Sequence, residues 1–382
     1  MRRFLLILLL SIVVLSAACV GSGNNPTSTS ETSTPSSSST TVTSSTSSPG
    51  ETSPTETSTP EPQRWNMTVV WNISTVGIPF MDMSPDGSLS AVIDWNNHIV
   101  YLVKPDGTAV SFDVQGNDDV EPVISGVVVK DGRVYVLGSY EAFSGVRVYS
   151  WNGQVGELEH GGSGSVADGM RRSPDGKHLC YLVSVSPTEQ VLRCDWGETK
   201  LTPNDYDINW VSNTGLVVLT EGGKSFVLKD GENLATLNTP NVIAYGDRLI
   251  ASEDGTLKIL APNGTVLATR ENAGFSQTTL LRWTLLPTGR YIFRHEPLED
   301  THVFTWNLSE VKTLPGFPYF ANENFVVTAK DGVIHCYSLR DFHEVFSVKV
   351  PGDSLGYVRL SDDGKVMLIS GETGDFWLYV AK

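Results

Sequence analysis

The sequence predicts an all-β architecture in which one four-stranded antiparallel unit is repeated along most of the chain. A tight turn recurs, with full copies at Ser84-Pro85-Asp86-Gly87 and Ser173-Pro174-Asp175-Gly176 and a close variant at Ser361-Asp362-Asp363-Gly364. Proline presets φ at the first corner, aspartate accepts hydrogen bonds from its own backbone, and glycine takes the positive φ. The runs beside each turn alternate between apolar and polar residues, as antiparallel strands do.

The successive units can be followed strand by strand. We expect strands at 80–83, 89–93, 98–103 and 109–114, then at 124–129, 133–137, 146–151 and 154–158, then at 170–173, 178–183, 190–196 and 199–201. Inner turns near Ser212, Gly246, Pro287 and Asn322 predict four more units. A last unit begins at 357–360 and ends one strand short at 376–380.

Corresponding turns are about 40 residues apart, which is the repeat length of four-stranded β-propeller blades. Counting the turns predicts an eight-bladed β-propeller. Seven blades remain the alternative, if the short units around Trp210 and Tyr245 form one blade. A lone strand at 66–73 precedes the first unit, and we expect it to pair with 376–380, which closes the ring and covers an exposed edge.

The Ser-Pro-Asp-Gly turns between apolar strands resemble those of the WD40-like and quinoprotein-like β-propeller superfamily over residues 65–382. The resemblance implies a propeller that acts as a binding or scaffold module. It also leaves an extracytoplasmic enzyme as an alternative, a hydrolase, lyase or quinone-dependent dehydrogenase that uses the central channel. No Trp-Asp pair closes a blade here; Trp151, Trp196 and Trp306 instead end third strands, where we expect tryptophan to pack between blades.

The amino-terminal residues predict export. Residues 1–19 have the basic start, apolar middle and small-residue end of a signal peptide, and the apolar run is shorter than the ~20 residues that span a bilayer as a helix. Ser16-Ala17-Ala18-Cys19 resembles a lipoprotein processing site, so we expect lipid on Cys19 and attachment to the outer face of the cell membrane, with a secreted protein as the alternative.

Residues 20–64 are rich in serine, threonine and proline, and residues 65–382 form the expected propeller. The first segment lacks the apolar side chains that a packed core needs, so we expect a disordered stalk. Four acceptor patterns for N-linked glycans follow, at Asn66, Asn72, Asn263 and Asn307.

The charge of the chain narrows the range of partners. Its formal net charge is −16, and residues 65–382 carry 24 basic and 39 acidic side chains. A strongly acidic surface repels nucleic-acid phosphates and anionic lipid, and it favours cations or basic proteins. We therefore expect no nucleic acid, and as partner an unknown protein or a cationic ligand bound by a monomeric propeller.

We predict that acidic loops around the mouth of the channel bind the ligand. In a propeller, the loops between second and third strands and those between blades share one face, opposite the Ser-Pro-Asp-Gly turns. The candidate ligand-binding residues on these loops are Asp118, Asp119, Glu121, Asp205, Asp207, Glu296 and Asp300. We assign no catalytic residue and no cofactor, although a divalent cation would suit such oxygen ligands.

Two further sets of residues have a chemical interpretation. His295 and His302 flank a carboxylate-rich loop and are weak candidates for metal ligands, because no helical or paired-cysteine spacing supports them. Cys180 and Cys194 lie opposite each other in a hairpin symmetric about Pro187, so a cross-strand disulfide and two buried thiols are both open.

Overall fold

The computed structural model describes residues 64–382, apart from residues 76, 78, 115–121, 141–143, 162–165, 203–204, 254, 272–284, 296–299 and 353. The chain divides at Thr59 into two units, and these residues all belong to the second, Pro60–Lys382. They form 32 strands in eight four-stranded antiparallel sheets, which confirms the predicted eight-bladed propeller over the seven-bladed alternative. Within this part of the chain, no helix is long and apolar enough to cross a lipid bilayer.

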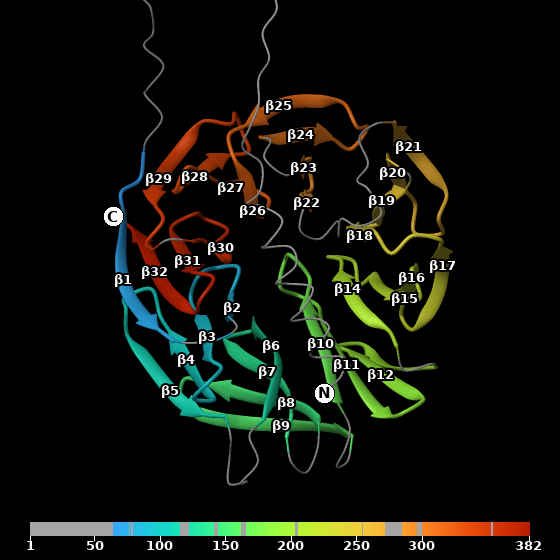
Figure 1. Ribbon diagram of the computed structural model, residues 1–382, viewed down its shortest axis with the longest axis horizontal. Coiled ribbons are helices and arrows are strands. Elements are labelled where there is room, and N and C mark those ends of the chain that lie inside the picture. Colours follow the sequence, from blue (N-terminus) through green and yellow to red (C-terminus); the bar gives the residue numbers. More distant parts are fainter. Residues whose placement is uncertain are drawn as a thin grey trace, which may run out of the picture. The chain divides into compact units, whose positions relative to one another are not determined.

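Each blade is one sheet, and its strands follow the chain from the inside of the ring outward (Figure 1). Blades 1 to 4 are β2–β5 (Phe80–Met83, Ser90–Asp94, Ile99–Val103, Ala109–Asp113), β6–β9 (Val123–Lys130, Arg133–Ser139, Ser144–Ser150, Gly153–Gly161), β10–β13 (Val166–Arg172, Leu179–Ser186, Glu189–Cys194, Gly197–Leu201) and β14–β17 (Asp207–Val211, Val217–Glu221, Lys224–Lys229, Glu232–Leu237).

The second half of the ring repeats this plan. Blades 5 to 8 are β18–β21 (Val242–Tyr245, Arg248–Glu253, Thr256–Leu260, Val266–Arg270), β22–β25 (Leu285–Pro287, Tyr291–Arg294, Thr301–Thr305, Glu310–Leu314), β26–β29 (Phe317–Ala321, Phe325–Lys330, Val333–Ser338, Glu344–Lys349) and β30–β32 (Val358–Leu360, Val366–Ser370, Asp375–Ala381) with β1 (Met67–Ser74).

The ring is closed by a strand from the amino-terminal side of the propeller. β1 pairs antiparallel with β32, from Met67 opposite Ala381 to Ser74 opposite Asp375, as the sequence predicted. Figure 1 shows the pair as a blue and a red strand side by side. The backbone N–H of Lys382 also donates to the carbonyl of Asn66 at 3.0 Å. The outer edge of β32 is therefore covered, and the last blade has its fourth strand.

The recurring turn has the same hydrogen bonds in each full copy. In blade 1, Ser84 Oγ donates to Asp86 Oδ1 at 2.6 Å and accepts from the N–H of Leu89 at 3.1 Å. Ser173 and Ser361 make the equivalent pair of bonds in blades 3 and 8. The serine hydroxyl thus joins both arms of the hairpin, which explains why this residue begins each turn.

These turns also contact each other from blade to blade. The N–H of Asp362 donates to the carbonyl of Pro85 at 2.7 Å. Gly87 has a φ of +72°, and a Cβ there would lie 2.8 Å from the Cβ of Ser361. Glycine is needed at this corner for its backbone conformation and for the close approach of the next turn.

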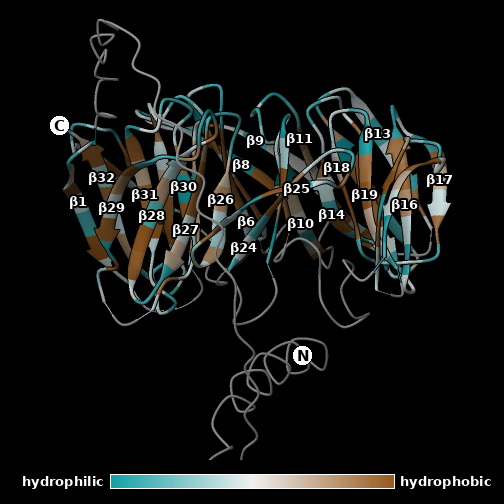
Figure 2. Cartoon of the chain, turned by 90° about the horizontal axis from the view of Figure 1, so that it is seen from above, coloured by the Kyte–Doolittle hydropathy of each residue, from teal (hydrophilic) through white to brown (hydrophobic). Residues whose placement is uncertain are grey.

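The core lies between the blades, where apolar faces of neighbouring sheets meet. Ile93 and Leu102 of blade 1 are fully buried with Val129 and Val136 of blade 2. Figure 2 shows hydrophobic residues along the strands and hydrophilic residues in many of the loops at the two faces. Trp306 ends a third strand and packs against Tyr245 of the preceding blade, with ring centroids 6.2 Å apart, as predicted for these tryptophans.

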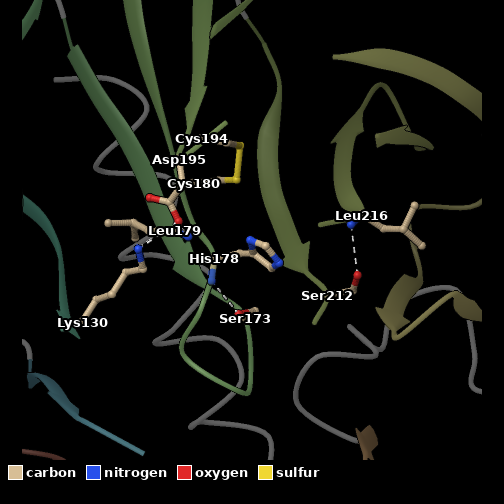
Figure 3. Close-up of a disulfide and its surroundings, with 9 residues drawn as sticks. All are labelled: Lys130, Ser173, His178, Leu179, Cys180, Cys194, Asp195, Ser212 and Leu216. Atoms are coloured by element: carbon tan, nitrogen blue, oxygen red, sulfur yellow. Dashed lines mark hydrogen bonds and ion pairs between the residues drawn. A yellow bond between two sulfur atoms is a disulfide. The ribbon is translucent and has the colours of Figure 1, made fainter. Parts of the chain in front are cut away.

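Blade 3 contains a disulfide between its second and third strands. The register places Cys180 opposite Cys194, and the two sulfur atoms are bonded (Figure 3). Beside it, Asp195 accepts a hydrogen bond from the N–H of Leu179 at 2.9 Å and pairs with Lys130 of blade 2 at 3.1 Å. The ion pair links the last residue of β6 in blade 2 to the hairpin of blade 3 that carries the disulfide.

Candidate functional site

The first strand of each blade is the innermost, so these strands surround the central channel (Figure 1). They enclose a cavity of about 560 Å³. Its wall is formed by β2, β6, β10, β14, β22, β26 and β30 together with their adjoining turns. A cavity of this size lies within the range of small-molecule binding sites in proteins.

Equivalent residues from seven blades line this cavity. Each stands two residues before the turn that joins the first and second strands of its blade. We call these residues the inner ring. They are Asp82, Val128, Arg171, Trp210, Leu286, Phe320 and Arg359. Three of the seven are charged, although the inner strands are otherwise largely apolar. The inner ring is therefore where this fold places polar chemistry inside the channel.

Asp82 connects four blades through its buried carboxylate. Its Oδ1 lies 3.2 Å from Nη2 of Arg172 in blade 3 and 3.3 Å from Nε of Arg359 in blade 8. Its Oδ2 accepts a hydrogen bond from the N–H of Val129 in blade 2 at 2.8 Å. The side chains of Asp82, Arg172 and Arg359 are 6%, 12% and 34% exposed. Both carboxylate oxygens are therefore occupied by protein donors.

The cavity wall is basic, in contrast to the acidic chain. Its charged residues are Arg171, Arg172 and Arg359 against Asp82 and Asp362, which leaves one guanidinium in excess. Burial raises the pKa of Asp362, although Arg172 acts in the opposite direction. Arg359 donates through Nε to Asp82 and through Nη1 to the carbonyl of Val358 at 3.1 Å. Among the described contacts, none uses Nη2 of Arg359.

Aromatic side chains line the same channel on the side of the blade-to-blade loops. Phe80 precedes Asp82 by two residues on β2, and Tyr357, directly before β30, precedes Arg359 by two. Both aromatic residues line the cavity and also pack on buried clusters between blades. Tyr319 also lines the wall and packs edge to face on Phe317, with centroids 5.0 Å apart. Burial, and secondarily the negative charge of Glu372, raises the pKa of the Tyr319 hydroxyl.

A second, smaller cavity of about 260 Å³ adjoins the first at this end. It shares Pro79, Gly356 and Tyr357 with the channel cavity and adds Leu355 and Glu372. The shared residues place the smaller cavity at the end of the channel that carries the blade-to-blade loops.

The predicted acidic residues lie in several places. Asp205 is exposed on the connection between blades 3 and 4, and Asp207 is exposed as the first residue of β14. Asp300 accepts a hydrogen bond from the N–H of Gly316 at 3.0 Å and pairs with Lys330 at 2.8 Å, and these contacts lower its pKa, that of Lys330 most. The other four candidates, Asp118, Asp119, Glu121 and Glu296, lie outside the described residues.

The two histidine candidates have different environments. His302 lies on β24, and its Nδ1 is 2.6 Å from Oε1 of Glu310. His295 is buried at the end of β23, edge to face with Phe317 at a centroid distance of 4.5 Å. In the described ranges, no group of three or more histidine, cysteine, aspartate or glutamate side chains is arranged to hold a metal ion.

The proposed modification sites lie partly inside and partly outside the described residues. The asparagine side chains are exposed at all four glycan acceptor positions, Asn66, Asn72, Asn263 and Asn307. Cys19 lies outside the described residues.

Sequence reasoning missed the inner ring, because it looked for ligands on loops and treated the inner strands as core. A signal was available. Asp82, Arg171 and Arg359 each stand two residues before the serine of a Ser-x-Asp-Gly turn, at equivalent positions in apolar strands. A charge that recurs at one position of the innermost strand is a signal, because the faces of that strand otherwise pack against neighbouring blades and a charge buried there needs a partner.

The fold and the channel define the class of protein: an eight-bladed, WD40-like β-propeller with a lined central cavity. Two solved structures resemble it in fold. The carboxy-terminal WD40 domain of Sif2 has a TM-score of 0.59 at 11% identity, covering 83% of this chain and 98% of that domain. The computationally designed Ika8 protein has a TM-score of 0.57 at 13% identity, covering 82% of this chain and 99% of that protein.

The chain belongs to the same family as an uncharacterized protein of Archaeoglobus fulgidus (strain ATCC 49558 / DSM 4304 / JCM 9628 / NBRC 100126 / VC-16). The two are 56% identical over 319 residues, which cover 84% of this chain and 90% of that protein. No protein-family model matches the chain.

Proposed function

We propose that this protein is a binding module whose ligand site is the central channel. The observation that carries the proposal is the cavity of about 560 Å³, in which arginine side chains and aromatic rings face a common space. Small-molecule sites typically combine apolar and aromatic walls with a few polar groups that fix the orientation of the ligand. The rigid sheets behind each wall residue hold that arrangement in place.

Binding agrees better with the wall than catalysis by an extracytoplasmic hydrolase, lyase or dehydrogenase. Among the described residues that line the cavity there is no histidine, lysine or cysteine, and its two serines, Ser125 and Ser173, already donate hydrogen bonds to the carbonyl of Ala167 and to Asp175. The carboxylate of Asp82 already accepts from two guanidinium groups and one backbone N–H, which disfavours a role in proton transfer.

The channel also has more structural support than the acidic loops. Asp300 is paired with Lys330, and Asp205 and Asp207 are exposed where the connection from blade 3 enters β14. A protein or cationic ligand on that face would be a second partner, bound independently of the channel.

The proposal includes export and a lipid anchor, which depend on the amino-terminal sequence. A signal peptide over residues 1–19, lipid on Cys19 and a stalk over residues 20–64 would hold the propeller outside the cell membrane. Mass spectrometry of the mature protein tests this part: a lipid-modified Cys19 as the first residue is expected, and an unprocessed amino terminus would contradict it.

A ligand-observed NMR screen tests the channel. The fragment panel would hold equal numbers of anionic, neutral and cationic members. Leu286→Trp fills the inner ring from a half-buried position, whereas Leu267→Trp adds the same side chain on an outer strand, where Leu267 is 56% exposed. Fragments that bind the unmodified chain should lose binding in the first variant and keep it in the second. Equal binding by both variants would refute the proposed site.

A further inference from the structure

We propose that the channel selects an organic carboxylate, whose acid group pairs with Arg359 while its apolar body lies against Phe80, Tyr319 and Tyr357. This inference rests on the proposed function, because it names the class of ligand for the same cavity. It opposes the expectation from the net charge of the chain, which favours a cation.

The local charge of the channel favours an anionic ligand. The cavity wall has three guanidinium groups and two carboxylates, so its charge is opposite in sign to the −16 of the whole chain. Charged groups in a narrow channel act at short range, whereas the charges of the outer surface are screened by salt beyond about 8 Å. The sign of the wall therefore decides which ligand is favoured inside.

The contacts of Asp82 and Arg359 determine which of the two can still bind a ligand. Asp82 makes three hydrogen bonds to protein donors, so a cationic ligand would have to displace Arg172, Arg359 or the N–H of Val129. Arg359 is the most exposed of the three charged side chains that meet here, and two of its three nitrogens are used. A carboxylate can pair with the remaining Nη2 and leave the contacts of Asp82 intact.

Aromatic side chains lie near Arg359 along the wall of the channel. Phe80 stands two residues before Asp82 on β2, and Tyr357 stands two residues before Arg359, directly before β30 begins. Two residues of extended chain place each ring roughly 6.6 Å from the charged residue, toward the loop face. An acid group at Arg359 would thus place a short apolar body beside these rings. The adjoining cavity at Pro79, Gly356 and Tyr357 lies at the same end, and Glu372 lines that cavity and not the channel cavity.

The test is isothermal titration calorimetry of the full chain with a charge series of probes of one shape. 3-Phenylpropionate is the acid, 3-phenylpropionamide the neutral isostere and 3-phenylpropylamine the cation. The acid is expected to bind at least tenfold more tightly than the amide, since a hydrogen bond to a charged group contributes that much. A tripeptide that ends in phenylalanine, with and without its free carboxylate, distinguishes a small acid from a peptide carboxy terminus as the source of the same group.

Variants locate the interaction. Arg359→Gln should weaken 3-phenylpropionate about tenfold or more and leave the amide unchanged, while Arg290→Gln, an exposed arginine on the turn between β22 and β23, should change neither. If Arg359→Gln does not fold, the probe series on the unmodified chain still decides the matter. Equal affinity for acid, amide and amine would overturn the carboxylate assignment. If Leu286→Trp then abolished binding of all three probes, the channel would still be supported as the ligand site.

Discussion

Replacing Asp82 by asparagine should destabilise the propeller strongly, because one carboxylate holds four blades together at the channel. Asparagine preserves the shape and one acceptor oxygen but leaves Arg172 without its charged partner. Removing one partner of a buried ion pair costs about 3–5 kcal/mol, and an exposed pair contributes less than about 1 kcal/mol. Arg172 is 12% exposed and belongs to the first class, whereas Arg359 at 34% is closer to the second. We expect a loss of about 3 kcal/mol.

Guanidinium-induced unfolding followed by tryptophan fluorescence measures this loss, since all nine tryptophans lie at position 65 or later. A double variant, Asp82→Asn with Arg172→Gln, should be more stable than the sum of the single effects predicts, by about 1–3 kcal/mol, as expected for residues in direct contact. A loss below 1 kcal/mol in Asp82→Asn, or strictly additive effects in the double variant, would show that the carboxylate does not organise the ring.

Three other predictions follow from the described contacts. Gly364→Ala should lower the free energy of unfolding by about 1–3 kcal/mol more than Gly132→Ala in the same unfolding assay. Both glycines have positive φ, but a Cβ at position 364 would lie 2.6 Å from Trp65, whereas nothing lies within 4 Å of a Cβ at position 132. Equal losses of stability would contradict the close packing at Gly364. Reducing the bond between Cys180 and Cys194, which are 14 residues apart, should lower stability by about 3 kcal/mol, read from calorimetry with and without reductant, and an unchanged melting temperature would exclude this contribution. Burial raises the pKa of Asp168 above its ordinary 3.8, so the stability that the protonated carboxyl contributes is lost as the pH rises from that value through the raised pKa. Asp168→Asn should therefore gain stability relative to the unmodified protein as the pH rises in the same unfolding assay, and a difference that does not change with pH would refute this.

The blades could be predicted from sequence because the information that defines them is local. Each Ser-x-Asp-Gly turn is specified by residues within five positions, and each strand by its own alternation. The same holds for the hairpin that brings Cys180 opposite Cys194. Closure by β1 required one further physical argument, that the edge of β32 needs a partner.

The channel site could not be predicted in the same way, because its partners are distant in sequence. Asp82 is 47, 90 and 277 residues from Val129, Arg172 and Arg359. Equivalent strand positions indicate that these residues share the channel, but they do not say which neighbours meet. Distances across the ring also depend on how far each blade tilts inward, and packing of whole sheets decides that.

The pairing of β1 with β32 has a consequence for how the molecule is held. Trp65 donates its N–H to the carbonyl of Val345 at 2.9 Å, and Lys382 reaches Asn66, so the two ends of the propeller leave side by side at its perimeter. A force applied there would act along the β1–β32 strand pair. The circle also has no privileged starting point: it could be cut between any two blades and rejoined across residues 66 and 382 with every sheet preserved.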